Sequence, residues 1–475
     1  MLKKLFSLLI ILSTISCSYK YRISVIQEDC EIYLNDIKIK NSEITTIKNR
    51  KPQLKITKRG YKDYQTTITS YFPFITKNIN IDLQKERYNV KINLIDGISN
   101  LIINEKDYGK TPLEIELESG IYNGILKRND YPDENIRIEC FSDMNLTFRH
   151  KKTKTPLYEM GIFKCGDQPK QVIFSYDNKK ILIPLLNEKG FELFDSYNRT
   201  SDNLFFHPPD KTNDTGYAEG LFIKEKGTFF VSQMTTGSIY EYDYNDFSFK
   251  RTVKTGGLYP KIIVYSKKQN VLAVSNWVSG NISIIDYESG NVLKKIKTAV
   301  APRGLVFSND EEYLYAADYE GGTISKIETS KWSIIKTITI QNGCMRHILI
   351  TKDDKYLYVS DMFNFNVLKI KTDDLSIENK YKVFYNPNTI DLSKNEKYLF
   401  VSCRGPNSSE GYLSRSPVDG KIEVIDLINN KIIYSFDGGN QTTGLDIDDT
   451  GRYLAFSNFR DANIEIYYLP DEYTK

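Results

Sequence analysis

The stretch "PRGLVFSNDEEYLYAADYEGGTISKIE" at residues 302–328 contains three short apolar segments separated by polar turns. The same order of segments returns at residues 345–371 as "MRHILITKDDKYLYVSDMFNFNVLKIK", in largely different letters. Short apolar runs bounded by Asn, Asp and Gly predict β-strands joined by tight turns. A recurrence of the whole outline therefore predicts a repeated structural unit.

Seven such units can be aligned along the C-terminal two thirds of the chain. They begin at residues 168, 217, 259, 301, 344, 386 and 441, so the steps are 49, 42, 42, 43, 42 and 55 residues. A period of about 42 residues is typical of one four-stranded sheet per repeat, stacked around an axis. One such sheet cannot bury its apolar faces alone, so we expect neighbouring sheets to cover one another.

The last unit stops after its third strand, "NIEIYYL" at 463–469. Residues 158–167, "YEMGIFKCGD", resemble the fourth strands that precede other units. We therefore predict that this N-terminal segment completes the last sheet and closes the ring, which would leave no exposed sheet edge.

The strand phrasing and the repeated Pro-[Lys/Arg] turns of residues 157–475 resemble the YVTN-type seven-bladed β-propellers, relatives of the lactonase and haem d1 propellers. The resemblance implies a propeller domain over residues 153–475 of an all-β protein. It implies no single function, because those propellers include binding scaffolds, lactonases, lyases and cofactor enzymes. WD40 propellers match less well, since their Gly-His and Trp-Asp pairs are missing.

Two smaller domains are expected before the repeats. Residues 87–152 resemble a PEGA domain, a small β-sandwich of bacterial surface proteins, whose turn and core positions match Asn104, Gly109, Thr111, Pro112, Gly120 and Tyr131. Residues 17–86 follow the same order without the Gly-x-Thr-Pro element, and we interpret them as a degenerate PEGA-like copy. The resemblance implies no catalytic group, and it leaves two roles open, a spacer or an adhesive module that faces the cell wall.

The first residues, "MLKKLFSLLIILSTISC", predict export. Two lysines precede an apolar run that is too short to cross a bilayer, and small residues follow. The end of this segment resembles the lipobox of bacterial lipoproteins, with Thr14 where Leu is usual. That resemblance implies a signal peptide at 1–16, lipidation of Cys17 and attachment to a membrane through the lipid, at the periplasmic face or the cell surface. The alternative is an ordinary signal peptide cleaved nearby.

Composition excludes several function classes. The chain has 64 Lys and Arg against 61 Asp and Glu, a net charge of +3 that falls to about +1 without Lys3 and Lys4, so nucleic-acid binding is not expected. The five cysteines after Cys17 have no CxxC spacing, and the three histidines are scattered. We therefore expect no disulfide framework, no metal site and no cofactor.

A candidate ligand site lies at the mouth of the expected channel. One aligned column of the repeats holds Lys170, Glu219, Lys261, Arg303, Arg346, Asn388 and Thr443, of which four are cationic. After the second strands follow an Asp/Asn-rich column and then further residues that include Trp277, Tyr319, Arg404 and Phe459. A basic ring with aromatic neighbours suits an anionic glycan, a small anion or an acidic peptide. Alternatively, the cations solvate turns and the Asp/Asn column hydrogen-bonds neighbouring loops.

Two further features surround this mouth. An insertion, "RGPNSSEGYLSRSPVDG" at 404–420, could fold over it as a lid or could be a tolerated surface loop. His347, beside Arg346, is counted among the candidate ligand-binding residues, and in the alternative of a lactonase-like or lyase-like enzyme it could act as a general base. No Ser-His-Asp set and no phosphate-binding Gly loop accompany it, so the sequence favours a non-catalytic binding scaffold.

Overall fold

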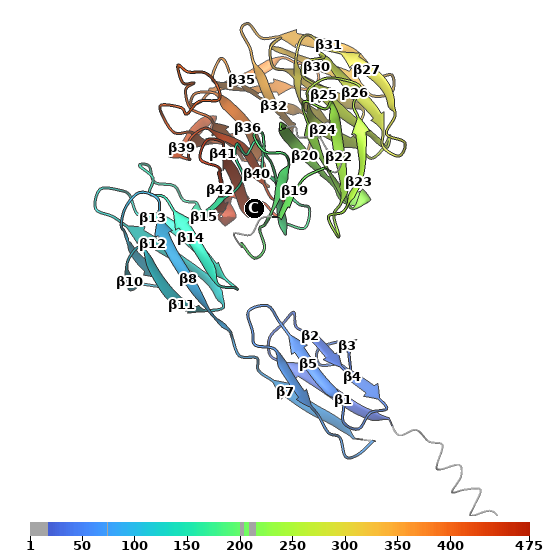
Figure 1. The fold of residues 1–475 in the computed structure, drawn as a ribbon, viewed down its shortest axis with the longest axis vertical. Coiled ribbons are helices and arrows are strands. Elements are labelled where there is room, and N and C mark those ends of the chain that lie inside the picture. Colours follow the sequence, from blue (N-terminus) through green and yellow to red (C-terminus); the bar gives the residue numbers. More distant parts are fainter. Residues whose placement is uncertain (1–17, 74, 200–203, 209–214) are drawn as a thin grey trace, which may run out of the picture. The chain divides into compact units, whose positions relative to one another are not determined.

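A computed structural model describes residues 18–73, 75–199, 204–208 and 215–475 (Figure 1). Nearly all regular structure in these ranges is β-strand, and the only helical elements described are two 3-10 turns, η1 (Lys224–Lys226) and η2 (Asp471–Tyr473). The all-β prediction is therefore confirmed. Many of the strands join small sheets of three or four members.

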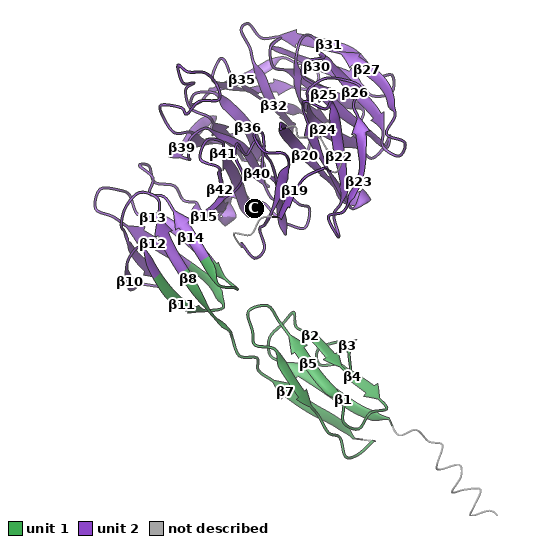
Figure 2. Cartoon of the chain, in the orientation of Figure 1, with its two compact units in different colours: residues 1–90, 114–122, 139–144 green, residues 91–113, 123–138, 145–475 purple. Residues whose placement is uncertain are grey.

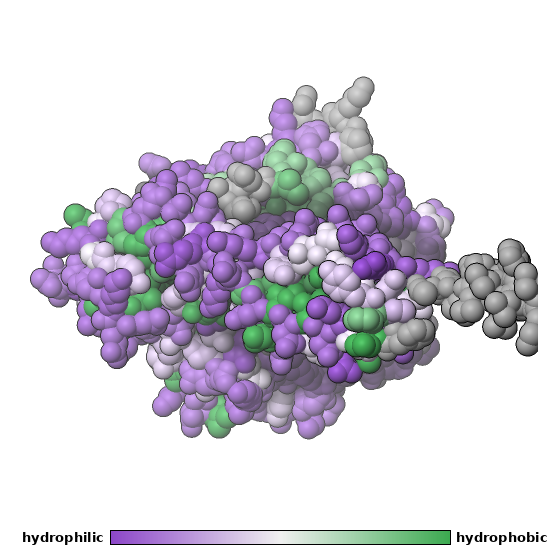
Figure 3. Space-filling model, turned by 90° about the horizontal axis from the view of Figure 1, so that it is seen from below, coloured by the Kyte–Doolittle hydropathy of each residue, from purple (hydrophilic) through white to green (hydrophobic). Residues whose placement is uncertain are grey.

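The described residues include no helix that is long and apolar enough to span a membrane. The proposed signal peptide at 1–16 and the lipidation residue Cys17 lie outside them. On the face shown in Figure 3, described hydrophobic residues form small patches among hydrophilic ones.

The chain divides into two compact units (Figure 2). One contains residues 1–90, 114–122 and 139–144, and the other contains residues 91–113, 123–138 and 145–475. The division runs through residues 87–152, so the expected domain boundaries stay a prediction.

The N-terminal strands form two small sheets. Their orders are β4-β1-β7 and β3-β2-β5-β6. Inward residues of both sheets make one core, which includes Tyr21, Ile32 and Leu54. Asn35 and Asp36 both have positive φ, which permits the tight β2–β3 hairpin. The strands are β1 (Tyr19–Val25), β2 (Glu31–Leu34), β3 (Ile37–Ile39), β4 (Ile44–Ile47), β5 (Gln53–Thr57), β6 (Tyr64–Thr67) and β7 (Thr76–Ile81).

The next seven strands divide between a three-stranded sheet, β11-β8-β14, and the start of an eight-stranded sheet, β10-β9-β12-β13-β15-β42-β41-β40. Asn104 and Glu105 have positive φ in the β9–β10 turn, and Gly109 follows at a bulge. The strands are β8 (Arg87–Leu94), β9 (Asn100–Ile103), β10 (Lys106–Lys110), β11 (Leu113–Glu118), β12 (Gly120–Lys127), β13 (Glu134–Cys140) and β14 (Met144–Phe148).

Six antiparallel four-stranded sheets follow in chain order, and each pairs its strands in sequence. The stretch 302–328 forms the first three strands of the fourth of these sheets. The sheets are β16 (Ile173–Phe174), β17 (Lys180–Pro184), β18 (Phe191–Asp195) and β19 (Leu204–Phe206); β20 (Tyr217–Ile223), β21 (Thr228–Gln233), β22 (Ser238–Asp243) and β23 (Phe249–Lys254); β24 (Pro260–Ser266), β25 (Val271–Asn276), β26 (Asn281–Asp286) and β27 (Val292–Lys297); β28 (Pro302–Phe307), β29 (Tyr313–Asp318), β30 (Thr323–Glu328) and β31 (Ser333–Thr339); β32 (Met345–Ile350), β33 (Tyr356–Asp361), β34 (Asn366–Lys371) and β35 (Ile377–Lys382); β36 (Pro387–Leu392), β37 (Tyr398–Cys403), β38 (Lys421–Asp426) and β39 (Lys431–Asp437).

Neighbouring sheets bury one another, as the repeat pattern predicts. One buried cluster joins Tyr315 and Ile324 of the fourth sheet to Leu357 and Val359 of the fifth. First strands contact in succession from β20 through β24, β28, β32 and β36 to β40. The series returns to its start, because β40 contacts β16 and β17 contacts β20.

The last sheet segment is completed by an N-terminal strand. The strands β40 (Thr442–Ile447), β41 (Tyr453–Asn458) and β42 (Asn463–Tyr468) pair in order. β15 (Tyr158–Lys164) then pairs with β42 in antiparallel register. The prediction that residues 158–167 supply this fourth strand is confirmed. The sequence did not predict that β15 also pairs with β13 in parallel, at Ile136 and Glu159.

A buried ion cluster lies where β13, β15 and β42 meet. Lys151 is fully buried, and its Nζ lies 3.2 Å from Glu134 Oε1 and 2.5 Å from Glu159 Oε2. The same ammonium lies 5.1 Å from the ring centroid of Tyr467 on β42. Burial raises the pKa of Glu159, and the nearby Lys151 opposes that shift. Lys151 is therefore the lysine that compensates the negative charge of the two glutamates in this cluster.

Candidate functional site

The cations of the aligned column are positioned by irregular starts of the first strands. The register of pairing with the second strand shifts across Lys261 in β24, Arg303 in β28 and Arg346 in β32. A bulge leaves one residue out of the ladder and redirects its side chain. The Pro-Lys and Pro-Arg pairs at 260–261 and 302–303 thus have a structural meaning, since each lies at such an irregularity, as Arg346 does after Met345.

The structure brings the cations of four repeats together and withdraws them from solvent. A carboxylate from the same column, Glu219, lies among them. Its Oε1 accepts a hydrogen bond from Arg303 Nη2 at 3.0 Å and lies 3.6 Å from Arg346 Nη2. The exposed fractions are 5% for Lys170, 4% for Lys261, 5% for Arg303, 1% for Arg346 and 2% for Glu219. We call these five residues the cation cluster.

Positive charge in the cation cluster exceeds what Glu219 can compensate. Burial lowers the pKa of Lys170 well below its usual value, and the nearby Arg346 and Arg303 lower it further. The pKa of Lys261 falls for the same reasons. Burial and Arg303 lower the pKa of Arg346 to about 10. The charged forms of Lys170, Lys261 and Arg346 are thus less stable here than in water, so a bound anion would be stabilising.

Several buried donors here have no hydrogen-bond partner among the described residues. They are Nη1 and Nη2 of Arg346, Nε of Arg303 and Nε1 of Trp277. An unpaired buried donor costs about 1–3 kcal/mol, so native proteins rarely keep one without a reason. A bound anionic group could accept hydrogen bonds from these donors.

Aromatic side chains border the cation cluster as expected. Lys261 Nζ lies 5.0 Å from the ring centroid of Trp277 and contacts Met234 Sδ. The rings of Trp277 and Tyr319 meet edge to face at 6.0 Å. The predicted cations of β24 and β28 and the aromatic residues that follow β25 and β29 therefore lie in one neighbourhood.

No protein-family model matches the chain. The chain does match a curated protein. Over 314 residues, 64% of this chain and 68% of the relative, the chain is 35% identical to Antigen Lp49 of Leptospira interrogans serogroup Icterohaemorrhagiae serovar copenhageni (strain Fiocruz L1-130). The chain belongs to the Antigen Lp49 family.

In this member of the Antigen Lp49 family, the insertion at 404–420 reaches the cation cluster. Tyr412 OH accepts a weak hydrogen bond from Lys170 Nζ at 3.4 Å, and the Arg404 guanidinium lies 3.4 Å from the Tyr412 ring centroid. Arg404 Nη2 also donates to Tyr412 O and to Gln441 Oε1. Both Lys170 and Arg404 lie 5.2 Å from the ring of Phe459. These contacts favour the lid interpretation over a tolerated loop.

Sequence reasoning missed Tyr412 and did not count Glu219 as a site residue. The one signal for Tyr412 is that it is a tyrosine in a segment rich in Gly, Ser and Pro. The sequence does not predict where such a loop folds back. Glu219 stood in the cation column as the sole acid. The alignment of the repeats shows its position, but only the structure shows that it is the shared partner of two arginines.

The Asp/Asn column has the structural role that the sequence left as an alternative. Asp318 accepts hydrogen bonds from Thr298 Oγ1 at 3.0 Å and from Thr323 Oγ1 at 2.9 Å. Asp361 accepts one from Cys344 N, and Asn458 accepts one from Gly439 N. This interpretation is confirmed for these residues of the Antigen Lp49 family member. The side chains fix the loops that carry the cations.

His347 is a poor general base in this setting. Desolvation, Arg346 and Arg303 lower the pKa of its imidazole to about 3. A catalytic base works best when its pKa lies near the working pH. The geometry therefore gives the enzyme alternative no support through this residue.

Proposed function

We propose that this protein is a lipid-anchored scaffold outside the cytoplasmic membrane that binds an anionic ligand through the cation cluster and does not catalyse a reaction. Its relationship to a protein named as an antigen supports a location exposed at the cell envelope. The segment before Cys17 supports the lipid anchor. The ligand is a small anion or an anionic group on an envelope glycan, peptide or protein.

The architecture that carries this site is a seven-bladed β-propeller of the YVTN type. Six four-stranded sheets and the β15-β42-β41-β40 segment would be its blades, with the cation cluster at the channel mouth. Residues 17–86 and 87–152 would be a degenerate and a regular PEGA domain between the anchor and the propeller. The closed series of contacts between first strands supports the ring.

The observation that carries the proposal is the imbalance of buried charge. Four buried cations share one carboxylate, and both terminal nitrogens of Arg346 have no hydrogen-bond partner among the described residues. An anion at the centre would relieve the repulsion and satisfy planar guanidinium donors. Glu219 then acts as an internal competitor that an anion partly replaces.

Opposite effects of two substitutions test this site. Arg346→Gln removes donors and charge, so affinity for an anion should fall about 10- to 100-fold. Glu219→Gln removes the competing carboxylate, so affinity should rise and anion-induced thermal stabilisation should exceed that of the parent. Phosphate, sulfate and citrate are suitable probes, measured by calorimetric titration and thermal unfolding at low salt.

Lys331→Gln is the control, since that side chain is 75% exposed in the turn between β30 and β31. It should bind the probes as the parent does. If Arg346→Gln and Glu219→Gln shift affinity in the same direction, or neither shifts it, the cation cluster is not the binding site.

The anchor is tested separately. Cys17→Ser should give protein that no longer partitions into the detergent phase, because no residue remains for lipidation. The parent and Cys30→Ser should both stay in the detergent phase. Retention of Cys17→Ser in the membrane fraction after a salt wash would disprove the anchor.

A further inference from the structure

A cavity of about 800 Å³ lies within the larger compact unit and outside the cation cluster. Its volume falls in the range of about 300–1,000 Å³ that is typical of ligand pockets. Its walls come from loops before the repeats, from the insertion at 404–420 and from loops of the last two sheets.

Charge in this cavity is nearly balanced, unlike charge in the cation cluster. Carboxylates from four aspartates face three formal cations, Arg149, Lys152 and Arg415. Carboxylates accept hydrogen bonds only, whereas guanidinium and ammonium groups donate only. A ligand with many hydroxyl groups can serve both kinds of partner, because each hydroxyl donates and accepts. A multiply charged anion or cation would meet repulsion from half of the lining.

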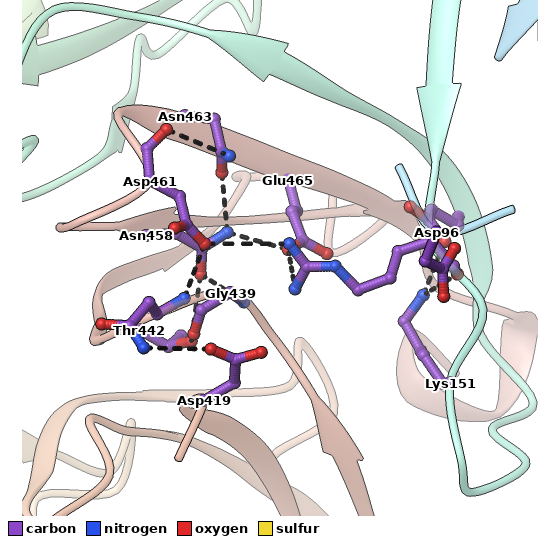
Figure 4. Close-up of polar contacts among 12 residues, drawn as sticks. Asp96, Lys151, Asp419, Gly439, Thr442, Asn458, Asp461, Asn463 and Glu465 are labelled. Atoms are coloured by element: carbon purple, nitrogen blue, oxygen red, sulfur yellow. Dashed lines mark hydrogen bonds and ion pairs between the residues drawn. The ribbon is translucent and has the colours of Figure 1, made fainter. Parts of the chain in front are cut away.

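Much of the polar lining is already fixed, and Figure 4 shows Asp419, Asp461 and Asn463 within a network of polar contacts. Asp461 Oδ2 accepts a hydrogen bond from Asn440 N at 2.7 Å, and Asp461 Oδ1 lies 2.8 Å from Arg415 Nη1. Asp419 Oδ1 accepts one from Asn440 Nδ2 at 3.0 Å, and Asn463 Oδ1 accepts one from Asn458 Nδ2 at 2.8 Å. Groups held in this way lose little freedom when a ligand binds.

Two buried lining groups lack a hydrogen bond among the described residues. They are Nδ1 of His150 and Nη1 of Arg149, whose ion partner Glu465 Oε1 lies 3.3 Å away. The other ring nitrogen of His150 already contacts Ser99 Oγ. Desolvation lowers the pKa of His150, which favours its neutral ring. Both nitrogens are buried, so a ligand hydroxyl reaches them when the Arg149 and His150 side chains shift toward the cavity.

The lining also offers a small apolar surface. Tyr131 contributes an aromatic ring, which packs at 5.3 Å from the His150 ring. Ile95 and Val418 are 53% and 49% exposed. A sugar ring presents a C–H face that packs on such groups, while its hydroxyls reach the polar rim.

We infer that this cavity binds a neutral, hydroxyl-rich oligosaccharide, independently of the anion at the cation cluster. The nearly balanced charge, the fixed donors and acceptors, the unsatisfied Arg149 and His150 atoms and the apolar surface all match that chemistry. Arg415 and residues 417–419 belong to the same insertion as Tyr412, so one segment borders both sites.

Neutral homotrisaccharides of glucose, mannose, galactose and N-acetylglucosamine are the probes, tested against the full mature chain by calorimetric titration. At least one should bind with little change between 50 and 500 mM salt, because the ligand carries no charge. Val418→Arg should weaken that binding at least tenfold by filling the cavity. Val300→Arg is the matched control, since Val300 is also 49% exposed but does not line the cavity.

Tyr131→Leu should also weaken binding, while Arg346→Gln should leave it unchanged, which separates this site from the cation cluster. The inference would be overturned if no trisaccharide binds, or if the Val418→Arg variant binds the trisaccharide as well as the Val300→Arg variant does. It would also be overturned if the cavity binds a peptide from a random library in place of a sugar and Val418→Arg abolishes that binding.

Discussion

Replacing Lys151 by methionine is expected to lower the free energy of unfolding by about 3–5 kcal/mol, the typical loss when one partner of a buried ion cluster is removed. Lys151 is fully buried and compensates Glu134 and Glu159 directly. Methionine fills a similar volume but leaves two buried carboxylates without their cation. Chemical denaturation at pH 7 measures the difference.

The neighbouring lysine provides the control for this prediction. Lys152 is exposed, so Lys152→Met should change the free energy of unfolding by no more than about 0.5 kcal/mol. Adding Glu159→Gln to Lys151→Met should recover part of the loss, because one buried carboxylate disappears. A single Lys151→Met variant as stable as Lys152→Met would show that the cluster contributes nothing.

The repeats were predictable because their signal is periodic and local. The second apolar segments of the two quoted stretches, "YLYAAD" and "YLYVSD", form β29 and β33. Alternation of apolar residues defines such strands, and the repeat spacing then predicts which sheets are neighbours. The closing role of β15 was also readable, since the last unit lacked a strand and this segment resembled one.

The sequence predicted only part of the candidate site. Alignment of repeats placed Lys170, Lys261, Arg303 and Arg346 in one column, because identical positions of a repeat converge on one axis. Tyr412 sits in a segment without a counterpart in other repeats, so no alignment could position it. Its contact with Lys170 became visible only when the insertion was seen to fold back.

The ion cluster at Lys151 was hidden for a different reason. In "HKKTKTP", residues 150–156, this lysine looks like one of several solvated charges. Its partners come from two strands, β13 and β15, whose parallel pairing has no sequence signature of its own. A contact that occurs only once, between segments that are not repeated, is therefore the kind that the sequence predicts least well.

Removing β15 should destabilise the repeats more than any single substitution discussed above. In a chain that begins at Asp167, β42 loses its antiparallel partner and becomes an exposed edge. Met160, Ile162 and Phe163, all buried, are lost with the strand. At about 1.5–3 kcal/mol for each buried apolar side chain, the loss is about 5 kcal/mol or more. Thermal unfolding should register it against a chain that begins at Lys154.

A synthetic peptide of residues 154–166 separates loss of the strand from loss of the chain before it. The peptide should raise the melting temperature of the chain that begins at Asp167 in a concentration-dependent way, because it binds the folded form and fills the open edge. A peptide with proline at Ile162 and Lys164 cannot maintain the β15 ladder and should have no effect. Equal melting temperatures for the chains that begin at Lys154 and Asp167, without peptide, would show that closure by β15 does not stabilise the repeats.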